Sequence, residues 1–214
     1  NNVCVVEADE YDRSFLKLSP DIAIITSMDP DHLDIYGTAE RMEQAFIDFS
    51  KRVKPGGLLI SKYGLSRTVD LFADQQLTYH LTDSNANIYA TNIAIHQGSY
   101  QFDVVINSTA SKWILQDVVL SMGGKHNIEN MIAAIAVAHH IGVEDNKIIT
   151  AVAAFRGVKR RFEYILKTDH QVFIDDYAHH PEELRALITG AKELFPNKKC
   201  IVVFQPHLFS RTRD

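Results

Sequence analysis

Two short apolar runs, each followed by acidic residues, constrain most strongly how this chain can fold. The first run, Val3–Val6, leads into Glu7-Ala8-Asp9-Glu10, and the second, Ile22–Ile25, is soon followed by Asp29-Pro30-Asp31-His32-Leu33-Asp34. Continuous β-branched runs are typical of strands buried on both faces of a parallel sheet. The residues between the runs are sufficient for a crossover connection with a short helix over 14–18. We therefore expect two parallel strands whose acidic segments share one edge of the sheet.

Glu7 and His32 are the residues at this edge that we predict to bind a metal ion. Parallel strands place their carboxyl ends together, so the carboxylate and the imidazole should converge. Carboxylate oxygens beside one imidazole suit a hard divalent cation, and Mg²⁺ is the best candidate. Acids after a strand also occur as solvated loop residues or helix N-caps, and this interpretation suits Asp29 and Asp34 better.

The composition excludes several classes of protein. The chain has 214 residues, of which 46% are hydrophobic, enough for one large domain or one and a part. A formal net charge of −5 argues against nucleic-acid binding, and no apolar run is long enough to span a membrane. No signal peptide is visible. Cys4 and Cys200 lie in apolar runs, so we expect reduced core cysteines and a cytoplasmic protein.

The remaining patterns predict an α/β fold. We expect a mostly parallel central sheet with helices on both faces and a small antiparallel sub-sheet, followed by a truncated Rossmann-like α/β domain. The basic segment 157–161 would be the hinge between a domain over 1–158 and another over 159–214. The chain starts inside a strand-like run and stops soon after another, so we expect a fragment of a longer protein. Helices are predicted over 38–53 with Thr38 as the N-cap candidate, over 67–72 with Ser66 as the N-cap candidate, over 145–155 and over 181–194. A further helix is predicted from an N-cap at Asn127 to Gly142. The remaining predicted strands cover 58–60, 77–81, 88–95, 100–106, 113–121, 162–166, 172–174 and 200–204.

Two polar segments are candidate binding sites. The glycines before Asn127 permit a close approach to the start of a helix, where an anion or a polar ring edge could bind, although the residue types alone favour a plain capped helix. Zinc at His179 and His180 is disfavoured, because adjacent histidines point apart and no cysteine pair is near. Contact with a phosphate or carboxylate suits that loop better.

Six polar motifs follow one another along nearly the whole chain. They are Glu7-Ala8-Asp9-Glu10, Asp31-His32, Gly124-Lys125-His126-Asn127 with Asn130, Arg160-Arg161-Phe162, Asp175-Asp176-Tyr177 with His179-His180-Pro181, and Phe204-Gln205-Pro206-His207 with Arg211-Thr212-Arg213-Asp214. Together they resemble the motifs of the Mur ligases, which build the peptide stem of bacterial peptidoglycan. The last two motifs favour the member of this family that adds alanine.

The resemblance implies an ATP-dependent, Mg²⁺-dependent amide ligase that joins L-alanine to UDP-N-acetylmuramate through an acyl phosphate. It maps the chain onto the central ATPase domain and the start of the C-terminal domain. The phosphate-binding loop GxxxxGK[ST] would lie upstream, so we expect the 214-residue piece alone to lack ligase activity. Domain closure would carry Arg161 onto ATP and exclude water from the acyl phosphate.

The same resemblance assigns a role to individual residues. Glu7 and His32 would ligate the metal. Arg161 and His179 would be catalytic. His126, Asn130, Arg161 and Asp176 would bind ATP, with Asp176 on the ribose. Tyr177, His179 and Arg211 would contact the substrate carboxylate or the incoming amino acid.

Two departures and three alternatives stay open. Leu208 stands where the alanine-adding enzymes often carry an arginine, and Ala178 replaces a common glycine, which puts fine substrate contacts in question. A muropeptide-recycling ligase that joins a tripeptide to the same sugar nucleotide is the nearest alternative. A non-catalytic binding module is the second, and a Mg²⁺-dependent hydrolase, for which no general base is clearly placed, is the weakest. The sequence leaves the oligomeric state open.

Overall fold

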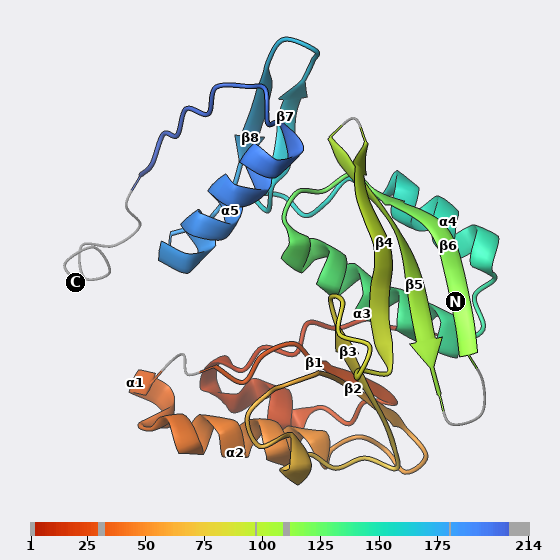
Figure 1. Ribbon diagram of the computed structural model, residues 1–214. Coiled ribbons are helices and arrows are strands. Elements are labelled where there is room, and N and C mark those ends of the chain that lie inside the picture. The colour runs from red at the N-terminus through yellow and green to blue at the C-terminus, as the bar shows by residue number, and fades with distance from the viewer. Residues whose placement is uncertain (1–2, 30–32, 97, 109–111, 180, 206–214) are drawn as a thin grey trace. The chain divides into compact units, whose positions relative to one another are not determined.

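Six strands follow one another in sequence order through one mixed sheet (Figure 1). The computed structural model describes residues 3–29, 33–96, 98–108, 112–179 and 181–205, and for 33, 34 and 182 the backbone alone. The chain divides into one unit of residues 1–89 with 107–111 and a second of residues 90–106 with 112–214. The strands of the sheet are β1 (Ile22–Ile25), β2 (Leu58–Lys62), β3 (Gln75–His80), β4 (Ile88–His96), β5 (Ser99–Asn107) and β6 (Lys112–Leu120).

The first part of the sheet is parallel, as expected of the central sheet, although β1 pairs with β2 and not with the run Val3–Val6. Ile22 of β1 pairs with Leu58 of β2, Leu58 pairs with Gln75 of β3, and Tyr79 of β3 pairs with Ile88 of β4, all in parallel register. Leu58, Leu59 and Ile60 of β2 are all buried, which explains this apolar run, and Ser61 after them is buried as well. The second part is antiparallel, because β4, β5 and β6 are neighbours joined by only a few residues. The expected sub-sheet is therefore confirmed, and β4 joins it to the parallel strands.

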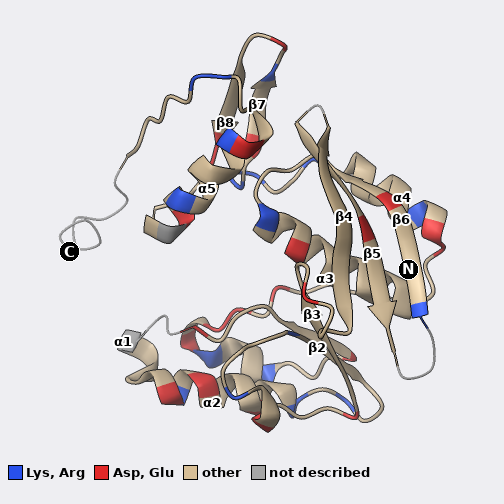
Figure 2. Cartoon of the chain, in the orientation of Figure 1, with Lys and Arg blue, Asp and Glu red and all other residues tan. Residues whose placement is uncertain are grey.

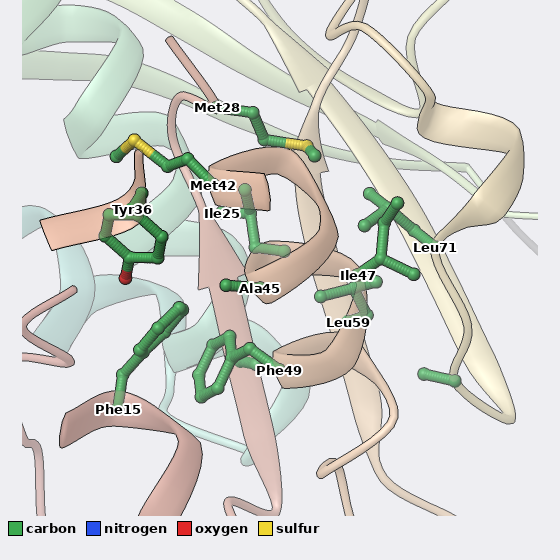
Figure 3. Close-up of a cluster of buried hydrophobic side chains, with 12 residues drawn as sticks. Phe15, Ile25, Met28, Tyr36, Met42, Ala45, Ile47, Phe49, Leu59 and Leu71 are labelled. Carbon is green, nitrogen blue, oxygen red and sulfur yellow. The ribbon is translucent and has the colours of Figure 1, made fainter. Parts of the chain in front are cut away.

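The core of the first unit lies between its sheet and its helices (Figure 3). Helix α2 (Ala39–Ser50) begins at Thr38, whose side chain accepts a hydrogen bond from the Arg41 amide at 3.3 Å, as expected of an N-cap. The other helical segments of this unit are the 3₁₀ segment η1 (Tyr11–Lys17), the short helix α1 (Leu33–Tyr36) and the 3₁₀ turn η2 (Thr68–Asp70). The buried cluster contains Phe15, Ala23, Ile25, Met28, Tyr36, Met42, Ala45, Ile47, Phe49, Leu59, Leu71 and Ala73.

The second unit contains the remaining predicted helices. They are α3 (Lys125–His140), α4 (Asp145–Ala154) and α5 (Pro181–Leu194). Gly142, with a φ of +80°, follows α3 as expected, and Pro181 is the first residue of α5. The strands β7 (Glu163–Lys167) and β8 (Val172–Asp175) pair in antiparallel register next to α5 in the sequence. The boundary that we placed between residues 158 and 159 stays a prediction.

Two predicted strands are wrong. Residues 3–6 and 200–204 form no strand in the described part of the chain, and their side chains are exposed, Val5 at 92% and Val203 at 95%. An apolar β-branched run favours an extended backbone, but a strand forms only where a neighbour accepts its hydrogen bonds. The expectation of core cysteines fails for the same reason, because Cys4 and Cys200, which are free thiols, are exposed.

Two predicted helix caps are also wrong. Helix α3 begins at Lys125 after Gly124, whose φ of +87° suits glycine, and Asn127 lies in the first turn, where its side-chain amide donates to the Gly123 carbonyl at 2.6 Å. Ser66 does not cap η2, because its hydroxyl donates to the Glu43 carboxylate at 2.7 Å. A polar side chain near a helix start has several partners within reach, and packing selects among them.

Within the described residues, no helix has the length and apolar character needed to cross a membrane.

Candidate functional site

The acidic segment before η1 is held by contacts on both sides of Glu7-Ala8-Asp9-Glu10. Ala8 is half-buried against the core of the first unit. The Asp9 carboxylate accepts from the Tyr11 amide at 2.9 Å, and the Asp9 carbonyl accepts from the Phe15 amide at 3.1 Å. These two Asp9 contacts anchor the segment to η1, which begins at Tyr11, although three of the segment's four residues are acids.

Glu7 keeps its carboxylate available for a ligand. The side chain is exposed, and no described residue forms a hydrogen bond or an ion pair with it. His32, the second predicted metal ligand, lies outside the described residues. Among those described, no three His, Cys, Asp or Glu side chains cluster closely enough to hold a metal. Mg²⁺ commonly takes only one or two carboxylates and keeps several waters, so the donor chemistry of Glu7 fits that ion.

The start of α3 is packed tightly against the segment that follows the hinge. A methyl group in place of the Gly123 hydrogen would overlap three atoms of the Phe162 ring, and one at Gly190 of α5 would lie 3.0 Å from the backbone of Gly124. Phe162 is 4% exposed. The glycines thus allow the close approach that the sequence predicted. The groups that approach them are the Phe162 ring and Gly190 of α5. His126 and Asn130, the predicted nucleotide contacts on α3, are both exposed.

A cavity of about 330 Å³ lies between the start of α3 and the middle of α5. Lys125 at the beginning of α3 forms an ion pair with Glu193 of α5 at 2.9 Å. Figure 2 shows that α5 carries charges of both signs. Its lining includes the basic side chains of Lys125 and Arg185 beside the start of α3, where the helix dipole favours an anionic ligand, together with the acidic side chain of Glu193. Its lining residues are Gly124, Lys125, His126, Arg185, Ala186, Thr189, Gly190 and Glu193.

The hinge and the Asp-Asp-Tyr loop are joined by backbone hydrogen bonds. The Tyr177 amide donates to the Arg160 carbonyl at 2.8 Å, and the Phe162 amide donates to the Asp176 carboxylate at 2.7 Å. The other Asp176 oxygen accepts from the Ala178 amide at 2.7 Å. Asp176 therefore fixes the position of the hinge, and each of its oxygens retains one lone pair for a ligand. Arg161, in the middle of this arrangement, is exposed.

His179 is oriented by two neighbours. Its Nδ1 lies 3.0 Å from the Tyr177 carbonyl, and its amide donates to the Glu183 carboxylate at 3.0 Å. The Tyr177 and His179 rings meet edge to face, with centroids 5.4 Å apart. These hydrogen bonds and ring contacts thus connect the hinge with the loop before α5. The two segments carry the predicted site residues Arg161, Asp176, Tyr177 and His179. Arg211 lies outside the described residues, as does Leu208.

A partly buried polar cluster joins the β4–β5 turn to β7. The Tyr164 hydroxyl and the Lys167 ammonium donate to the Gly98 carbonyl at 3.3 and 3.1 Å. Burial raises the pKa of Tyr164 well above its usual value, and the neighbouring Tyr100 adds to this shift. Burial lowers the pKa of Lys167. Both shifts favour the neutral forms, as expected where water is displaced.

Sequence reasoning missed Arg185, Thr189 and Glu193 as cavity residues. They lie on α5 at helical spacing, and nothing in their local sequence distinguishes them from the solvated face of an amphipathic helix.

Comparison with known protein families identifies the family of this chain. The Mur ligase middle domain matches residues 1–138, and the Mur ligase glutamate ligase domain matches residues 160–214. The chain belongs to the Mur ligase family. The resemblance drawn from the six motifs is therefore confirmed, as is the fold class that it implied.

Relatives of this Mur ligase chain include UDP-N-acetylmuramate–L-alanine ligases. That of Christiangramia forsetii is 46% identical over 100% of this chain and 45% of its own length, and that of Cytophaga hutchinsonii is 44% identical over 98% and 44%. The crystal structure of the Thermotoga maritima UDP-N-acetylmuramate–alanine ligase matches with a TM-score of 0.76 and 30% identity, over 94% of this chain and 44% of that one. This chain spans less than half the length of these relatives.

A murein peptide ligase is a more distant structural neighbour. The enzyme of Psychrobacter arcticus matches with a TM-score of 0.54 and 25% identity, over 86% of this chain and 37% of that one.

Proposed function

We propose that the protein carrying this Mur ligase chain joins L-alanine to UDP-N-acetylmuramate with ATP as the energy source. The observation that carries the proposal is the 46% identity, over all 214 residues, to the Christiangramia forsetii UDP-N-acetylmuramate–L-alanine ligase. The cavity at the start of α3 supports it, because the basic side chains of Lys125 and Arg185 in its lining suit anionic substrates.

The proposed reaction has two steps. An oxygen of the muramate carboxylate attacks the γ-phosphorus of ATP, forming an acyl phosphate and releasing ADP. The amine of L-alanine then attacks the acyl carbon, inorganic phosphate leaves with the electron pair of the broken C–O bond, and the amine loses a proton to give the amide. The difficulty is to hold several anions together while charge spreads over the transferred phosphoryl group.

The residues of the second unit supply positive charge and positioning. Arg161 directly precedes Phe162, whose ring packs on Gly123, so its backbone is held beside the start of α3. The guanidinium there would neutralise charge on the phosphates, and His126 and Asn130 would contact the adenine. Asp176, braced by two amides, would accept from the ribose hydroxyls.

The substrate would meet the loop at the start of α5. Tyr177 and His179, two positions apart in that loop, carry a hydroxyl and an imidazole that would contact the muramate carboxylate or the incoming amine. Arg211 would assist them. Because the rings of Tyr177 and His179 touch, a change in one should alter the position of the other.

Mg²⁺ would be held by Glu7 and His32, and there it would supply positive charge that offsets the negative charge of the phosphates. Glu7, an exposed carboxylate without a described protein partner, suits this role.

The test is phosphate release by the protein that carries this sequence, supplied with ATP, Mg²⁺ and UDP-N-acetylmuramate. L-Alanine should stimulate release and yield the amide, whereas the stem tripeptide should not. Preference for the tripeptide would support the recycling ligase instead. Arg161→Lys keeps the charge but loses the planar fork, and we expect it to lower kcat with little change in folding. Binding of ATP or UDP-N-acetylmuramate without amide formation by the wild-type protein would favour a binding module, and unchanged activity in both Arg161→Lys and Glu7→Gln would remove these two residues from the proposed site.

A further inference from the structure

Tyr36 joins the two segments that carry the predicted metal ligands. It is the last residue of α1, four positions after His32, and its hydroxyl donates to the Glu10 carbonyl at 2.6 Å. Glu10 ends the acidic segment that begins with Glu7. One hydrogen bond therefore connects two residues that are 26 positions apart, and each of them lies three or four positions from a predicted metal ligand.

The Tyr36 hydroxyl has few alternatives to this bond. The side chain is 1% exposed and lies in the hydrophobic core beside Phe15, with its oxygen directed toward the segment that carries Phe15 (Figure 3). The Arg13 guanidinium lies 5.1 Å from the centre of its ring and covers it. Burial raises the pKa of Tyr36, partly offset by Arg13, while Glu10, Asp12 and Asp9 raise it further, so the hydroxyl stays protonated and remains a donor.

The Glu10 carbonyl is also a turning point of the backbone. It accepts a second bond from the Arg13 amide at 3.0 Å, and Asp12 and Arg13 both have positive φ, +51° and +63°. Left-handed backbone at two consecutive non-glycine residues is strained and persists only where surrounding contacts hold it. The Tyr36 bond and the burial of Phe15 against Phe46 and Phe49 are such contacts.

We propose that Tyr36 is a positioning residue that fixes the Glu7–Glu10 segment against α1 and so preorganises Glu7 to bind a divalent cation. This inference rests on the proposed function, because it assumes that Glu7 is a ligand. Tyr36 does not touch the cation. It acts through the backbone of Glu10, while half-buried Ala8 holds the other side of the segment, so that the Glu7 side chain is presented outward.

The test is Mn²⁺ binding, measured by the electron paramagnetic resonance of the free ion, in the wild-type protein and in Tyr36→Phe. The substitution removes the hydroxyl and keeps the ring and its packing. We expect Mn²⁺ affinity to fall by about fivefold, the size of one lost hydrogen bond. Glu7→Gln should abolish the same binding.

Ser50→Ala is the matched control. It also removes one buried hydroxyl from the first unit, one that donates to the Ile47 carbonyl at 2.7 Å and accepts from the Phe72 amide at 3.0 Å, and neither bond involves the acidic segment. Its Mn²⁺ affinity should equal that of the wild type, even where urea unfolding shows a comparable loss of stability.

The outcomes separate the inference from the function on which it rests. Equal Mn²⁺ affinity in Tyr36→Phe and the wild type would overturn the role of Tyr36. An equal loss of Mn²⁺ affinity in Tyr36→Phe and Ser50→Ala would overturn it too. Both outcomes leave the proposed function standing. Undiminished binding in Glu7→Gln, or no Mn²⁺ binding by the wild type, removes Glu7 from the proposed metal site and the role of Tyr36 with it.

Discussion

Replacing Gly123 by alanine tests the packing that places the hinge beside α3. The new methyl group would overlap the Cζ, Cε1 and Cε2 atoms of the Phe162 ring, and Phe162, at 4% exposure, has little room to move. Its amide is also bound to Asp176 at 2.7 Å, which restrains the backbone. The side chain must therefore leave its position or the segment must shift.

Two opposing effects set the size of the loss. Overpacking a filled site costs about 1–3 kcal/mol. The backbone of Gly123 does not have a positive φ, so alanine also restricts the unfolded chain, which stabilises the fold by about 0.4–1 kcal/mol. The net expectation is a destabilisation of about 1–2 kcal/mol, or a fall of about 0.5–1 M in the urea midpoint for a typical slope.

Tryptophan fluorescence is the natural assay for Gly123→Ala. Trp113 is the chain's single tryptophan, and it stacks on His139 of α3 with centroids 4.0 Å apart, so it reports on the second unit. Gly190→Ala is the comparison. Its methyl would lie 3.0 Å from the Gly124 backbone, but alanine gains about 1 kcal/mol inside a helix, so the net change should be small.

A double-mutant cycle identifies the group that the methyl meets. In a Phe162→Ala background the ring is gone, so Gly123→Ala should be neutral or stabilising. An equal cost of Gly123→Ala in both backgrounds would refute the packing argument, as would an unchanged urea midpoint in the single variant.

The remaining predictions concern other contacts. Ser50→Ala removes the hydroxyl that accepts a hydrogen bond of 3.0 Å from the Phe72 amide. We expect the free energy of unfolding, measured in urea, to fall by about 1–3 kcal/mol, whereas full stability would show that water replaces the hydroxyl. Thr38→Ala should cost about 1 kcal/mol and Thr38→Asn much less, since only the latter keeps the cap on the Arg41 amide; equal losses would argue against capping. The folded-state pKa of Tyr164 is raised above the unfolded value of about 10, so its contribution to stability is complete below that pH and is lost as the pH rises further. The urea midpoint should therefore fall between about pH 9 and 11 less steeply in Tyr164→Phe than in the wild type, and parallel curves would contradict the assignment.

The sequence was sufficient for the elements whose signals are local. The apolar run of β1 and the buried run of β2 predicted parallel strands, and Thr38 predicted the start of α2, because strand and helix periodicities and caps depend on residues a few positions apart. The six motifs identified the family, since their order along the chain is itself a sequence property. The same local rules failed for residues 3–6 and 200–204, which have the composition of strands but no described neighbour to pair with.

Only the tertiary structure decided which distant groups meet. No sequence pattern indicates that the Tyr36 hydroxyl bonds to the Glu10 carbonyl, or that Phe162 fills the space left by Gly123. The cavity residue Arg185 likewise has the sequence signature of a solvated helix position. The residue types that can bind phosphate or metal can be identified in the sequence. Their partners are selected by packing between segments far apart in sequence, because shape and burial, rather than sequence spacing, determine these contacts.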